Sequence, residues 1–355
     1  MVTLEELVQQ LVERGGSDLH VSCGAPPMIR IHGRLVPTDC GILDNEGSRK
    51  LIYSILDNEQ ILRFEKDMEL DMAFGISGLG RFRTNVFMQR GSVGAVIRVI
   101  PSEPAPLSEL GLPEETLKEL CLRNRGLILV TGSTGSGKST TLAAMLDFIN
   151  EERNGHIITI EDPLEFVHRN KRCLVNQREV GADTLNYKDA LKRVLRQDPD
   201  VVMIGELRDQ ESISAALTLS ETGHLTLGTL HTNDAVQTIN RIIDVFPPHQ
   251  QQQIRTQLSF SLEAVICQQL AERADGKGRA LAHEVLIATA AVRALSRDSK
   301  VHQITSLIQT GNKHGMKTMN QALWDLYRSR LITYEEALNR SPDQDDLKRI
   351  FHRQG

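Results

Sequence analysis

Apolar and polar residues follow two different patterns in the two parts of this chain. The first part has apolar positions at helical spacing over residues 3–14 and 48–64, and at strand spacing over 17–22, 28–33, 80–88 and 94–100. Helices and strands mixed in this way are typical of a small α+β domain. We therefore predict such a domain over residues 1–100, without a catalytic motif of its own.

The second part has short apolar runs separated by helical segments. The four runs are Leu127–Val130, Ile157–Ile160, Val201–Ile204 and Leu225–Thr232. Runs that alternate with helices are typical of a parallel sheet with helices on both faces, and the ligands of such sheets bind beyond the carboxyl ends of the strands. A hairpin over 266–272 and 281–287 and helices from about residue 289 to 355 complete this predicted α/β domain.

The stretch Pro101-Ser102-Glu103-Pro104-Ala105-Pro106 separates the two patterns. Prolines at this density preclude a helix and favour an extended chain. We place a linker at residues 101–106, the first domain at 1–100 and the second at 107–355. The segment from Leu107 to Arg123 is predicted to be a helix that leads into the first strand of the sheet.

The strongest motif follows the first apolar run. Residues 132–139 read Gly-Ser-Thr-Gly-Ser-Gly-Lys-Ser, which matches G-x-x-x-x-G-K-[ST], and residues 140–146 are helical in pattern. Strand, glycine loop and helix are the context of a phosphate-binding loop, because glycine lets backbone N–H groups close around a polyphosphate at the positive end of a helix. An ordinary turn rich in glycine and serine is the alternative, and the agreement of the flanking segments argues against it.

This loop predicts a site for ATP and Mg²⁺. The residues expected to bind the nucleotide are Gly132, Ser133, Thr134, Gly135, Ser136, Gly137, Lys138, Ser139 and Thr140. Lys138 is expected to reach the β- and γ-phosphates, and the Ser139 hydroxyl is expected to hold Mg²⁺. The energy of hydrolysis is then available for work that the loop alone does not identify.

Two glutamates and a histidine follow the other apolar runs. Glu206 follows a buried strand as a Walker B acid does, and is expected to hold Mg²⁺ directly or through water. Glu161 ends the neighbouring run and is expected to orient or deprotonate the attacking water, and His231 to contact the γ-phosphate. Acids after strands also cap helices, and a single histidine often has a structural role, but three such side chains at the edge that carries the loop favour ATP hydrolysis.

No arginine that completes such a site is evident beside the loop, and two candidates lie in the first domain. With the hairpin turn centred between Arg90 and Gly91, Arg83 lies directly opposite Arg98. Like charges opposed across two strands are unfavourable unless an anion lies between them. Two solvated arginines are one interpretation, and a two-arginine clamp for a phosphate at a subunit interface is the other.

Composition restricts the remaining classes of function. A net charge of −5 and an aromatic content of 4% give no sign of a nucleic-acid surface, so we expect no such partner. The 5 cysteines are scattered without a C-x-x-C pair, which favours a reducing compartment and disfavours a zinc module. With no signal-peptide pattern and no apolar run of about 18 residues, we expect a cytoplasmic protein that reaches a membrane only through partners.

Three segments around these residues resemble the named boxes of type II/IV secretion ATPases. The segments are Ile160–His168 (Asp box), Asp198–Asp209 (Walker B segment) and Thr222–Thr232 (His box). The stretches Ser17–Gly33 and Gly80–Arg83 are similar to the N-terminal domain of PilT-like twitching-motility ATPases, and Leu307–Gly311 with Gly315–Met319 also fits. The resemblance therefore covers nearly the whole chain.

The resemblance implies an α/β fold: a RecA-like P-loop ATPase core, preceded by a smaller α+β PAS-like domain and followed by a helical C-terminal extension. It implies a homohexamer that hydrolyses ATP at the cytoplasmic face of the bacterial inner membrane and retracts type IV pili against a polytopic inner-membrane platform protein. By residue, it makes Glu161 the catalytic base, Glu206 the Walker B acid and His231 a nucleotide contact. It makes Arg83 and Arg98 the arginines that reach nucleotide at a subunit interface.

The chain departs from the family at one motif. Retraction ATPases typically carry Ala-Ile-Arg-Asn-Leu-Ile-Arg-Glu after the core, where residues 291–298 here read Ala-Val-Arg-Ala-Leu-Ser-Arg-Asp. Arg293 and Leu295 match, but the motif as a whole has drifted. An accessory paralogue is therefore an alternative. An extension or type II secretion ATPase is another, which the lack of a four-cysteine module and of a long N-terminal extension disfavours. A nucleic-acid-translocating ATPase is a third. A regulator without hydrolysis is disfavoured by Glu161 and Glu206.

Overall fold

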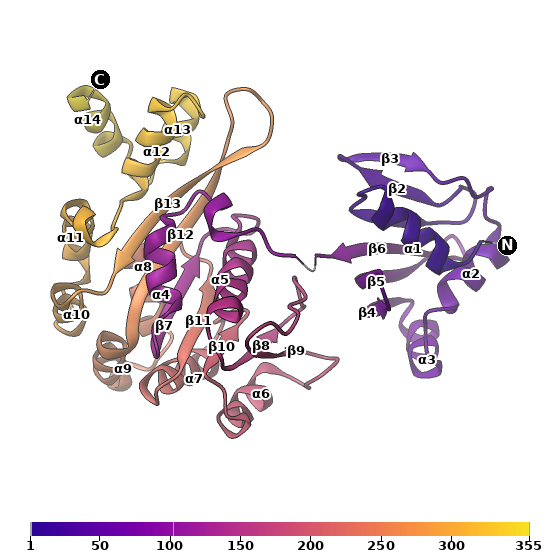
Figure 1. Cartoon of the computed structure of the whole chain (residues 1–355), viewed down its shortest axis with the longest axis horizontal. Coiled ribbons are helices and arrows are strands. Elements are labelled where there is room, and N and C mark those ends of the chain that lie inside the picture. The colour runs from indigo at the N-terminus through magenta and orange to yellow at the C-terminus, as the bar shows by residue number, and fades with distance from the viewer. Residues whose placement is uncertain (1, 102, 355) are drawn as a thin grey trace. The chain divides into compact units, whose positions relative to one another are not determined.

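The computed structural model describes residues 2–101 and 103–354 of the chain (Figure 1). Ser102, within the predicted linker, lies outside the described residues, as do Met1 and Gly355 at the two ends of the predicted domains. The described residues form two compact units, and each unit has its own sheet and its own hydrophobic core.

The division between the units falls within the proline-rich stretch. The first unit comprises the residues up to Glu103 together with the short segment Glu165–Val167. The second comprises Pro104–Leu164 and the residues from His168 onward. The chain therefore leaves the second unit briefly, between two of its strands, and then returns to it.

In its described residues, the first unit is a six-stranded antiparallel sheet packed against helices. Its elements are α1 (Leu4–Glu13), β1 (Asp18–Val21), β2 (Met28–Ile31), β3 (Arg34–Pro37), α2 (Asn45–Tyr53), α3 (Asn58–Asp67), β4 (Glu69–Ile76), β5 (Gly80–Gln89) and β6 (Ser92–Ile100). The strand order is β3-β2-β1-β6-β5-β4, and neighbours run antiparallel. The buried apolar side chains of α1, including Leu7 and Leu11, pack with Leu19, Phe82 and Ile97 of the sheet.

The hairpin of β5 and β6 has the predicted register. Phe82 pairs with Val99, and Arg83 pairs with Arg98. Arg90, at the turn, has φ of 48° and the following Gly91 has φ of 75°. Two positive φ values in succession give a turn whose twist matches that of antiparallel strands. The two arginines therefore lie side by side on one face of the sheet.

The helix predicted over residues 48–64 is wrong in one respect, because two helices, α2 and α3, occupy this range. Ser54 Oγ donates to Leu51 O at the end of α2. Asp57 then caps α3 and forms a reciprocal capping box with Gln60. Serine and aspartate compete with helical hydrogen bonding in this way, so the chain restarts a helix at this point. Strands β3 and β4 were not predicted.

In its described residues, the second unit is built around a seven-stranded sheet. Its elements are α4 (Glu114–Cys121), β7 (Gly126–Thr131), α5 (Lys138–Glu152), β8 (His156–Glu161), β9 (Leu174–Glu179), α6 (Tyr187–Val194), β10 (Val201–Ile204), α7 (Gln210–Glu221), β11 (Leu225–Leu230), α8 (Ala235–Asp244), α9 (Pro248–Ser261), β12 (Leu262–Glu272), β13 (Arg279–Ile287), α10 (Ala290–Arg297), α11 (Ile304–Thr310), α12 (Met319–Arg328), α13 (Tyr334–Arg340) and α14 (Gln344–Gln354). The strand order is β13-β12-β7-β11-β10-β8-β9.

The sheet of the second unit is parallel except at β13. Strand β7 pairs in parallel with β11 and β12, and β10 pairs in parallel with β11 and β8. Strands β12 and β13 form the predicted hairpin, which joins the sheet beside β7. The predicted α/β domain with a parallel sheet and a helical C-terminal part is therefore confirmed.

The helix predicted from Leu107 to Arg123 is shorter in the structure. A single 3₁₀ turn at Leu107–Glu109 is followed by a break, and α4 begins only at Glu114. Gly111, with φ of 72°, and Pro113, which has no backbone N–H, account for the break. Strand β9 was not predicted.

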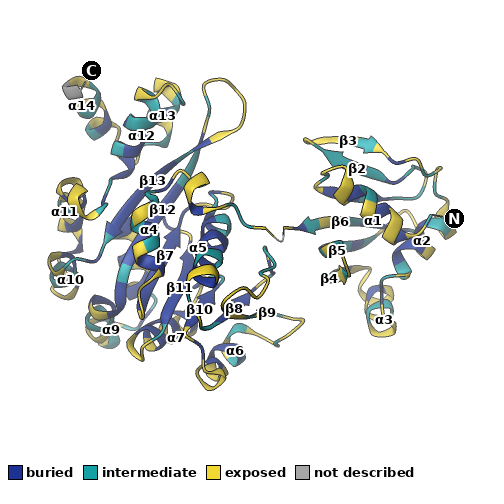
Figure 2. Ribbon diagram, in the orientation of Figure 1, coloured by how far each residue is buried: buried dark blue, intermediate teal, exposed yellow. Residues whose placement is uncertain are grey.

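The central strands of the second unit, β7, β8, β10 and β11, are buried on both faces, as Figure 2 shows by their dark colour against the yellow outer surfaces of the helices. Leu127 and Leu129 of β7 belong to one buried cluster, and Ile128 and Val130 belong to the other. Alternate residues of a buried parallel strand therefore contact helices on opposite faces. Within the described ranges, the structure contains no helix with the length and apolar character that crossing a bilayer requires.

The C-terminal helices pack on the side of the sheet that ends with β13 (Figure 1). Trp324 and Tyr327 of α12 contact Phe351 of α14 with ring centroids 5.0 and 4.9 Å apart. Tyr334 of α13 contacts Phe351 at 4.9 Å. These ring contacts join α12, α13 and α14 into one cluster.

Candidate active site

The phosphate-binding loop lies between β7 and α5, where the motif places it. Gly132, Gly135 and Gly137 have φ of 142°, 76° and 95°, values that residues with a Cβ rarely adopt. A Cβ on Gly132 would also lie 2.3 Å from Gln268 O and 2.5 Å from Ser136 Oγ. Gly137, the N-cap of α5, provides no side-chain cap, so the first N–H groups of this helix are left for an anion.

Lys138 begins α5, and its side chain folds back over the loop. Its Nζ donates to Gly132 O at 2.8 Å and to Ser133 O at 3.0 Å. An ammonium group held by carbonyl oxygens gains by exchanging them for charged phosphate oxygens. Of the remaining loop residues, Ser133, Thr134 and Gly135 are exposed, Gly137, Ser139 and Thr140 are half-buried, and Gly132 and Ser136 are buried.

Gln268 lies beside the loop and was not among the residues predicted from the sequence. It belongs to β12, whose pairing with β7 brings it to this position. Its Nε2 donates to Thr141 Oγ1 on α5 at 2.7 Å. Within the described residues, its Oε1 and Ser136 Oγ are buried without a hydrogen-bond partner. Unpaired buried polar atoms mark a place where polar ligand groups or water are expected.

Four parallel strands end at one edge of the sheet, in the order β8, β10, β11 and β7. A backbone hydrogen bond joins each strand end to the next: Gly205 N to Ile160 O at 2.8 Å, Leu207 N to Thr229 O at 2.9 Å, and Gly132 N to Leu230 O at 3.3 Å. This carboxyl edge therefore carries Glu161, Glu206, His231 and the loop in that order. Because β11 separates β10 from β7, His231 follows the strand that is next to the loop.

Glu161 is the last residue of β8 and is 6% exposed. Its Oε1 accepts hydrogen bonds from Thr159 Oγ1 at 2.7 Å and from Gln177 Nε2 at 3.2 Å. Two neutral donors on one oxygen fix the orientation of the carboxylate. Gln177 lies on β9, a strand that the sequence pattern did not predict, so this contact was missed as well.

Glu206 follows β10 and has two cationic or polar neighbours. Its Oε2 accepts from Arg208 Nε at 2.8 Å, and its Oε1 lies 3.5 Å from His231 Nε2. The structure therefore brings two of the predicted site residues, Glu206 and His231, together. Arg208 was missed by the sequence reasoning, which found no arginine beside the loop in this domain. The hydrogen bond to Glu206 raises the pKa of Arg208, so its charge is retained at every physiological pH.

Asp162 and Tyr187 extend this group of side chains. Arg208 Nη1 lies 3.9 Å from Asp162 Oδ2. A Cβ on Gly205 would lie 3.0 Å from Tyr187 Oη, which places the phenol against the strand end. Burial first, and then the negative charge of Asp162, raise the pKa of Tyr187. The phenol is therefore a neutral hydroxyl beside the acids of the carboxyl edge.

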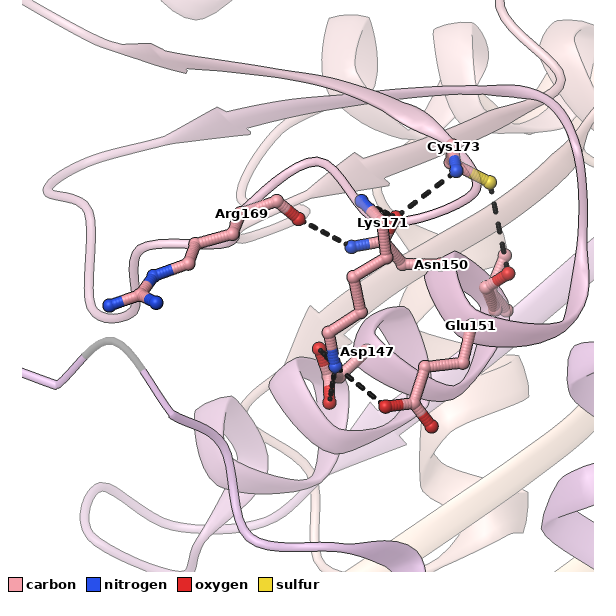
Figure 3. Close-up of polar contacts among 7 residues, drawn as sticks. Asp147, Asn150, Glu151, Arg169, Lys171 and Cys173 are labelled. Carbon is pink, nitrogen blue, oxygen red and sulfur yellow. Dashed lines mark hydrogen bonds and ion pairs between the residues drawn. The ribbon is translucent and has the colours of Figure 1, made fainter.

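The segment that follows Glu161 is attached to α5 through Asn150 (Figure 3). Asn150 is fully buried, and its Nδ2 donates to Arg169 O at 2.7 Å. Its Oδ1 accepts from Lys171 N at 3.1 Å and from Cys173 N at 3.2 Å. A buried amide that satisfies several backbone groups holds this segment in one position.

Ion pairs form the outer part of the same attachment. Lys171 Nζ lies 2.8 Å from Asp147 Oδ1 and 2.7 Å from Glu151 Oε1, both on α5 (Figure 3). These side chains are partly exposed, so their pairing adds less than the buried amide does. Because α5 begins with Lys138, one helix connects the loop with the segment that follows Glu161.

Arg83 and Arg98 belong to the first unit, where the structure pairs one of them with an acid of the chain. Arg98 Nε lies 2.8 Å from Asp18 Oδ1, and Arg30 Nε lies 3.8 Å from Asp18 Oδ2. Burial raises the pKa of Asp18, but the hydrogen bond from Ser17 and the Arg98 guanidinium outweigh it and leave this pKa below 3.8. Arg83 is exposed and has no ion pair or hydrogen bond within the described residues.

The oxygen donors at the carboxyl edge fit Mg²⁺ bound together with a nucleotide. The described residues contain no group of three or more His, Cys, Asp or Glu side chains that would hold a metal ion by itself. Ser139 would supply one hydroxyl and Glu206 one carboxylate. Mg²⁺ typically takes one or two such ligands from the protein and completes its shell with water and phosphate oxygens.

Comparison with known proteins agrees with this geometry. The sequence model of the family described as "Type II/IV secretion system protein" matches residues 63–340. The chain is 48% identical, over 94% of its length and 96% of the relative, to the "Type IV pilus retractation ATPase PilT" of Pseudomonas aeruginosa. It is 44% identical, over 97% of its length and 90% of the relative, to the "Type IV pilus ATPase PilU" of the same organism.

A solved structure matches both units and the C-terminal helices. The "Crystal Structure of the Pilus Retraction Motor PilT and Bound ADP" superposes with a TM-score of 0.91 at 48% identity and covers 98% of this chain and 100% of that chain. The predicted fold class is therefore confirmed. That neighbour holds a nucleotide, which agrees with the nucleotide site predicted from the loop. The roles of the individual site residues stay predictions.

Proposed function

We propose that this chain, which belongs to the Type II/IV secretion system protein family and is an ATP hydrolase, drives the retraction of type IV pili. The observation that carries the proposal is similarity to a pilus retraction ATPase along nearly the whole chain. A phosphate-binding loop alone identifies only a nucleotide-binding protein. Similarity that includes the first unit and the C-terminal helices covers parts of the chain that nucleotide binding alone does not require.

The residues of the carboxyl edge have separate tasks in this proposal. The loop N–H groups and Lys138 bind the phosphates of ATP, and Ser139 and Glu206 hold Mg²⁺, which neutralises phosphate charge when it is bound. Glu161, oriented by Thr159 and Gln177, accepts a proton from the attacking water. Each task needs only a side chain that the structure places at this edge.

Glu206, Arg208 and His231 form the part of the site that distinguishes ATP from ADP. The Arg208 guanidinium and the His231 ring both contact the Glu206 carboxylate in the structure. A γ-phosphate offers them a stronger anionic partner, because it carries more charge and more acceptor oxygens than a carboxylate. We infer that Arg208 and His231 exchange Glu206 for the γ-phosphate and return after its release.

The assembly that we propose is a homohexamer on the cytoplasmic face of the inner membrane, in contact with the pilus platform protein. Arg83 and Arg98 then reach the nucleotide of a neighbouring subunit, where an arginine stabilises the charge that develops during phosphoryl transfer. Hydrolysis in one subunit thereby depends on the position of the next. The membrane is reached through the platform protein.

An accessory role is the second candidate, favoured by the drifted motif at residues 291–298. In the structure Arg293 of this motif donates to Ser259 O at 3.0 Å and pairs with Glu263 at 2.8 Å. Arg293, which the typical motif also contains, therefore holds α10 against the end of α9. The residues that have changed are the ones that would distinguish the two roles.

Pilus retraction in a deletion strain tests the proposal. Complementation with the wild-type gene is expected to restore twitching, and Lys138→Ala is expected to fail because it removes the phosphate-binding ammonium. Lys277→Ala is the control, because Lys277 is exposed in the turn between β12 and β13. Normal twitching in the deletion strain would rule out the primary role and favour the accessory one.

A further inference from the structure

Glu284 is a buried carboxylate that joins the starts of two helices. It lies in β13 and is 6% exposed. Its Oε1 accepts a hydrogen bond from Ala235 N at 2.9 Å, and its Oε2 accepts one from Met319 N at 3.4 Å. Ala235 is the first residue of α8 and Met319 the first residue of α12. Both bonds also place the carboxyl group at the positive ends of these helices, which favours its ionised form.

Among the described residues, Glu284 accepts hydrogen bonds from these two backbone N–H groups and forms no ion pair with a cationic side chain. Burial, and to a smaller extent the nearby Asp234, raise the pKa of Glu284 to about 7, and the two N–H groups act in the opposite direction. A buried charge that loses one of two donors is left poorly compensated. The position of each helix start therefore affects how well the other is held.

The start of α8 is connected to the carboxyl edge. Ala235 follows His231 by four positions in the chain. Between them, Thr232 Oγ1 lies 2.7 Å from Thr238 Oγ1, and Thr238 Oγ1 donates to Asp234 O at 2.7 Å. These bonds attach Thr232 and Asp234 to the first turn of α8. We therefore expect a movement of His231 to displace Ala235 N.

The start of α12 is connected to the C-terminal helices. Thr318 caps α12 in a reciprocal capping box with Gln321. Further along this helix, Trp324 and Tyr327 pack against Phe351 of α14. A change at the first turn of α12 is therefore passed to the cluster that these aromatic rings join.

We propose that Glu284 is a positioning residue that couples the nucleotide contact at His231 to α12 and the C-terminal helices. The inference rests on the proposed role of His231 at the γ-phosphate. When His231 turns from Glu206 to the nucleotide, Ala235 N shifts away from Glu284, and the carboxylate then depends on Met319 N. The first turn of α12 follows the carboxylate. Linkage makes this coupling reciprocal. If nucleotide changes the affinity for a partner that binds α12, that partner changes the affinity for nucleotide by the same factor.

Hydrogen exchange of the full-length protein, with and without AMP-PNP and Mg²⁺, tests this coupling. In the wild type, the amides of residues 319–328 are expected to change their exchange rate by at least about fivefold on nucleotide binding, the lower end of typical coupling. In Glu284→Gln this change is expected to fall below about twofold, because glutamine accepts from one N–H group and presents its own N–H₂ to the other. AMP-PNP binding itself is measured in parallel.

Asn320→Ala is the matched control on the same helix. Asn320 is buried and donates to Asp343 O at 2.9 Å and to Asp346 Oδ2 at 2.8 Å, contacts that do not involve α8. This variant is expected to lose stability but to keep the full response of α12 to nucleotide. A purely structural role for Glu284 predicts that the two variants behave alike.

The outcomes separate this inference from the proposed function. If the wild type binds AMP-PNP but the exchange rates of residues 319–328 do not change, the coupling alone is overturned. The coupling is also overturned if these rates change as much in Glu284→Gln as in the wild type. A wild-type chain that does not bind AMP-PNP overturns both. Should Glu284→Gln fail to fold, Glu284→Asp takes its place with the same expected loss, because its shorter carboxylate does not reach both helices.

Discussion

The sheets of the two units arrange charge in opposite ways. In the first unit, Arg30, Asp18, Arg98 and Arg83 form a row across four antiparallel strands, and each residue lies directly opposite the next. In the second unit, charged side chains lie at the ends of parallel strands. The row has three arginines and one acid, whereas acids and basic side chains are mixed at the carboxyl edge. The row therefore has an excess of positive charge that its own side chains do not neutralise.

The acids of the ion pairs in the two regions differ in burial, whereas their arginines are exposed in both. Asp18 has a side-chain exposure of 7%, and its partner Arg98 has one of 67%. Glu206 and Arg208 have side-chain exposures of 24% and 56%. Exposed pairs contribute little stability and exchange partners easily. We therefore expect the carboxyl edge to rearrange when a ligand binds, whereas the buried Asp18 holds Arg98 and leaves Arg83 able to reach an anion.

Removal of the free arginine is expected to have the largest effect. Arg83→Ala should lower ATP turnover by about 10³-fold or more, the contribution of an arginine that stabilises transferring phosphate, without loss of stability, because Arg83 holds no partner. Arg98→Ala should lower turnover to a similar extent and also destabilise the first unit, because Asp18 loses its nearest cation. Steady-state ATPase assays and thermal unfolding measure both effects, and Arg34→Ala, on the exposed strand β3, is the control.

Mixed assemblies test whether these arginines act on a neighbouring subunit. Arg98→Ala subunits retain a complete loop, and Lys138→Ala subunits retain both arginines. Mixing the two variants is therefore expected to restore part of the activity that each lacks alone. Wild-type turnover in both arginine variants would contradict a catalytic role for the row.

Substitution of the buried acid at the carboxyl edge is expected to have the next largest effect. Glu161→Gln should lower kcat by about 10²–10⁴-fold, the range for loss of a general base, and should leave nucleotide affinity nearly unchanged, because Gln177 and Thr159 orient either side chain. Single-turnover kinetics and ADP binding distinguish the two parameters. Glu152→Gln, at the exposed end of α5, is the control. A Glu161→Gln variant with reduced affinity and normal kcat would assign this residue to binding instead.

Substitution of the acid in the row is expected to have the smallest effect on activity and to act on stability. Asp18→Asn should lower the free energy of unfolding at pH 7 by about 1.5–3 kcal/mol, the value of hydrogen bonds to a charged group. Since the folded state lowers the pKa of Asp18 below 3.8, this contribution is present above pH 3.8 and is lost as the pH falls through the lower pKa of the folded state. Urea unfolding at pH 7 and pH 3 measures the difference between wild type and variant.

A wild-type advantage that persists unchanged at low pH would show that Asp18 stabilises the sheet through packing instead of charge. Ser17→Ala sharpens the interpretation. Ser17 Oγ donates to Asp18 Oδ2 at 2.7 Å, so its removal should raise the pKa of Asp18 and shift the loss of stability toward higher pH.

Local patterns predicted the parts of this molecule that depend on neighbouring residues. The four strands that end at the carboxyl edge are continuous apolar runs, and the hairpin register follows from the position of the turn at Arg90 and Gly91. The loop is predicted by its motif, and Glu161, Glu206 and His231 follow from the rule that parallel strands end at one edge. Each of these inferences needs only chain order and strand direction.

Contacts between distant segments could not be predicted in this way. Strand β9 reads Leu-Val-Asn-Gln-Arg-Glu, which is too polar to indicate a strand, yet it supplies Gln177 to Glu161. Gln268 lies beside the loop only because β12 joins the sheet next to β7. Arg208 has no pattern of its own, and its contact with Glu206 depends on the course of the chain after β10. The sequence therefore predicted which acids lie at the carboxyl edge and did not predict what orients them.

The assignment of Glu165–Val167 to the first unit has a consequence for recombination between related proteins. Val167 N donates to Pro101 O at 3.0 Å, a contact within that unit. A chimera joined at residues 101–106 alone would combine one parent's first unit with the other parent's residues 165–167. The exchangeable module is therefore discontinuous, and a functional hybrid requires two crossovers that inherit both segments from the same parent.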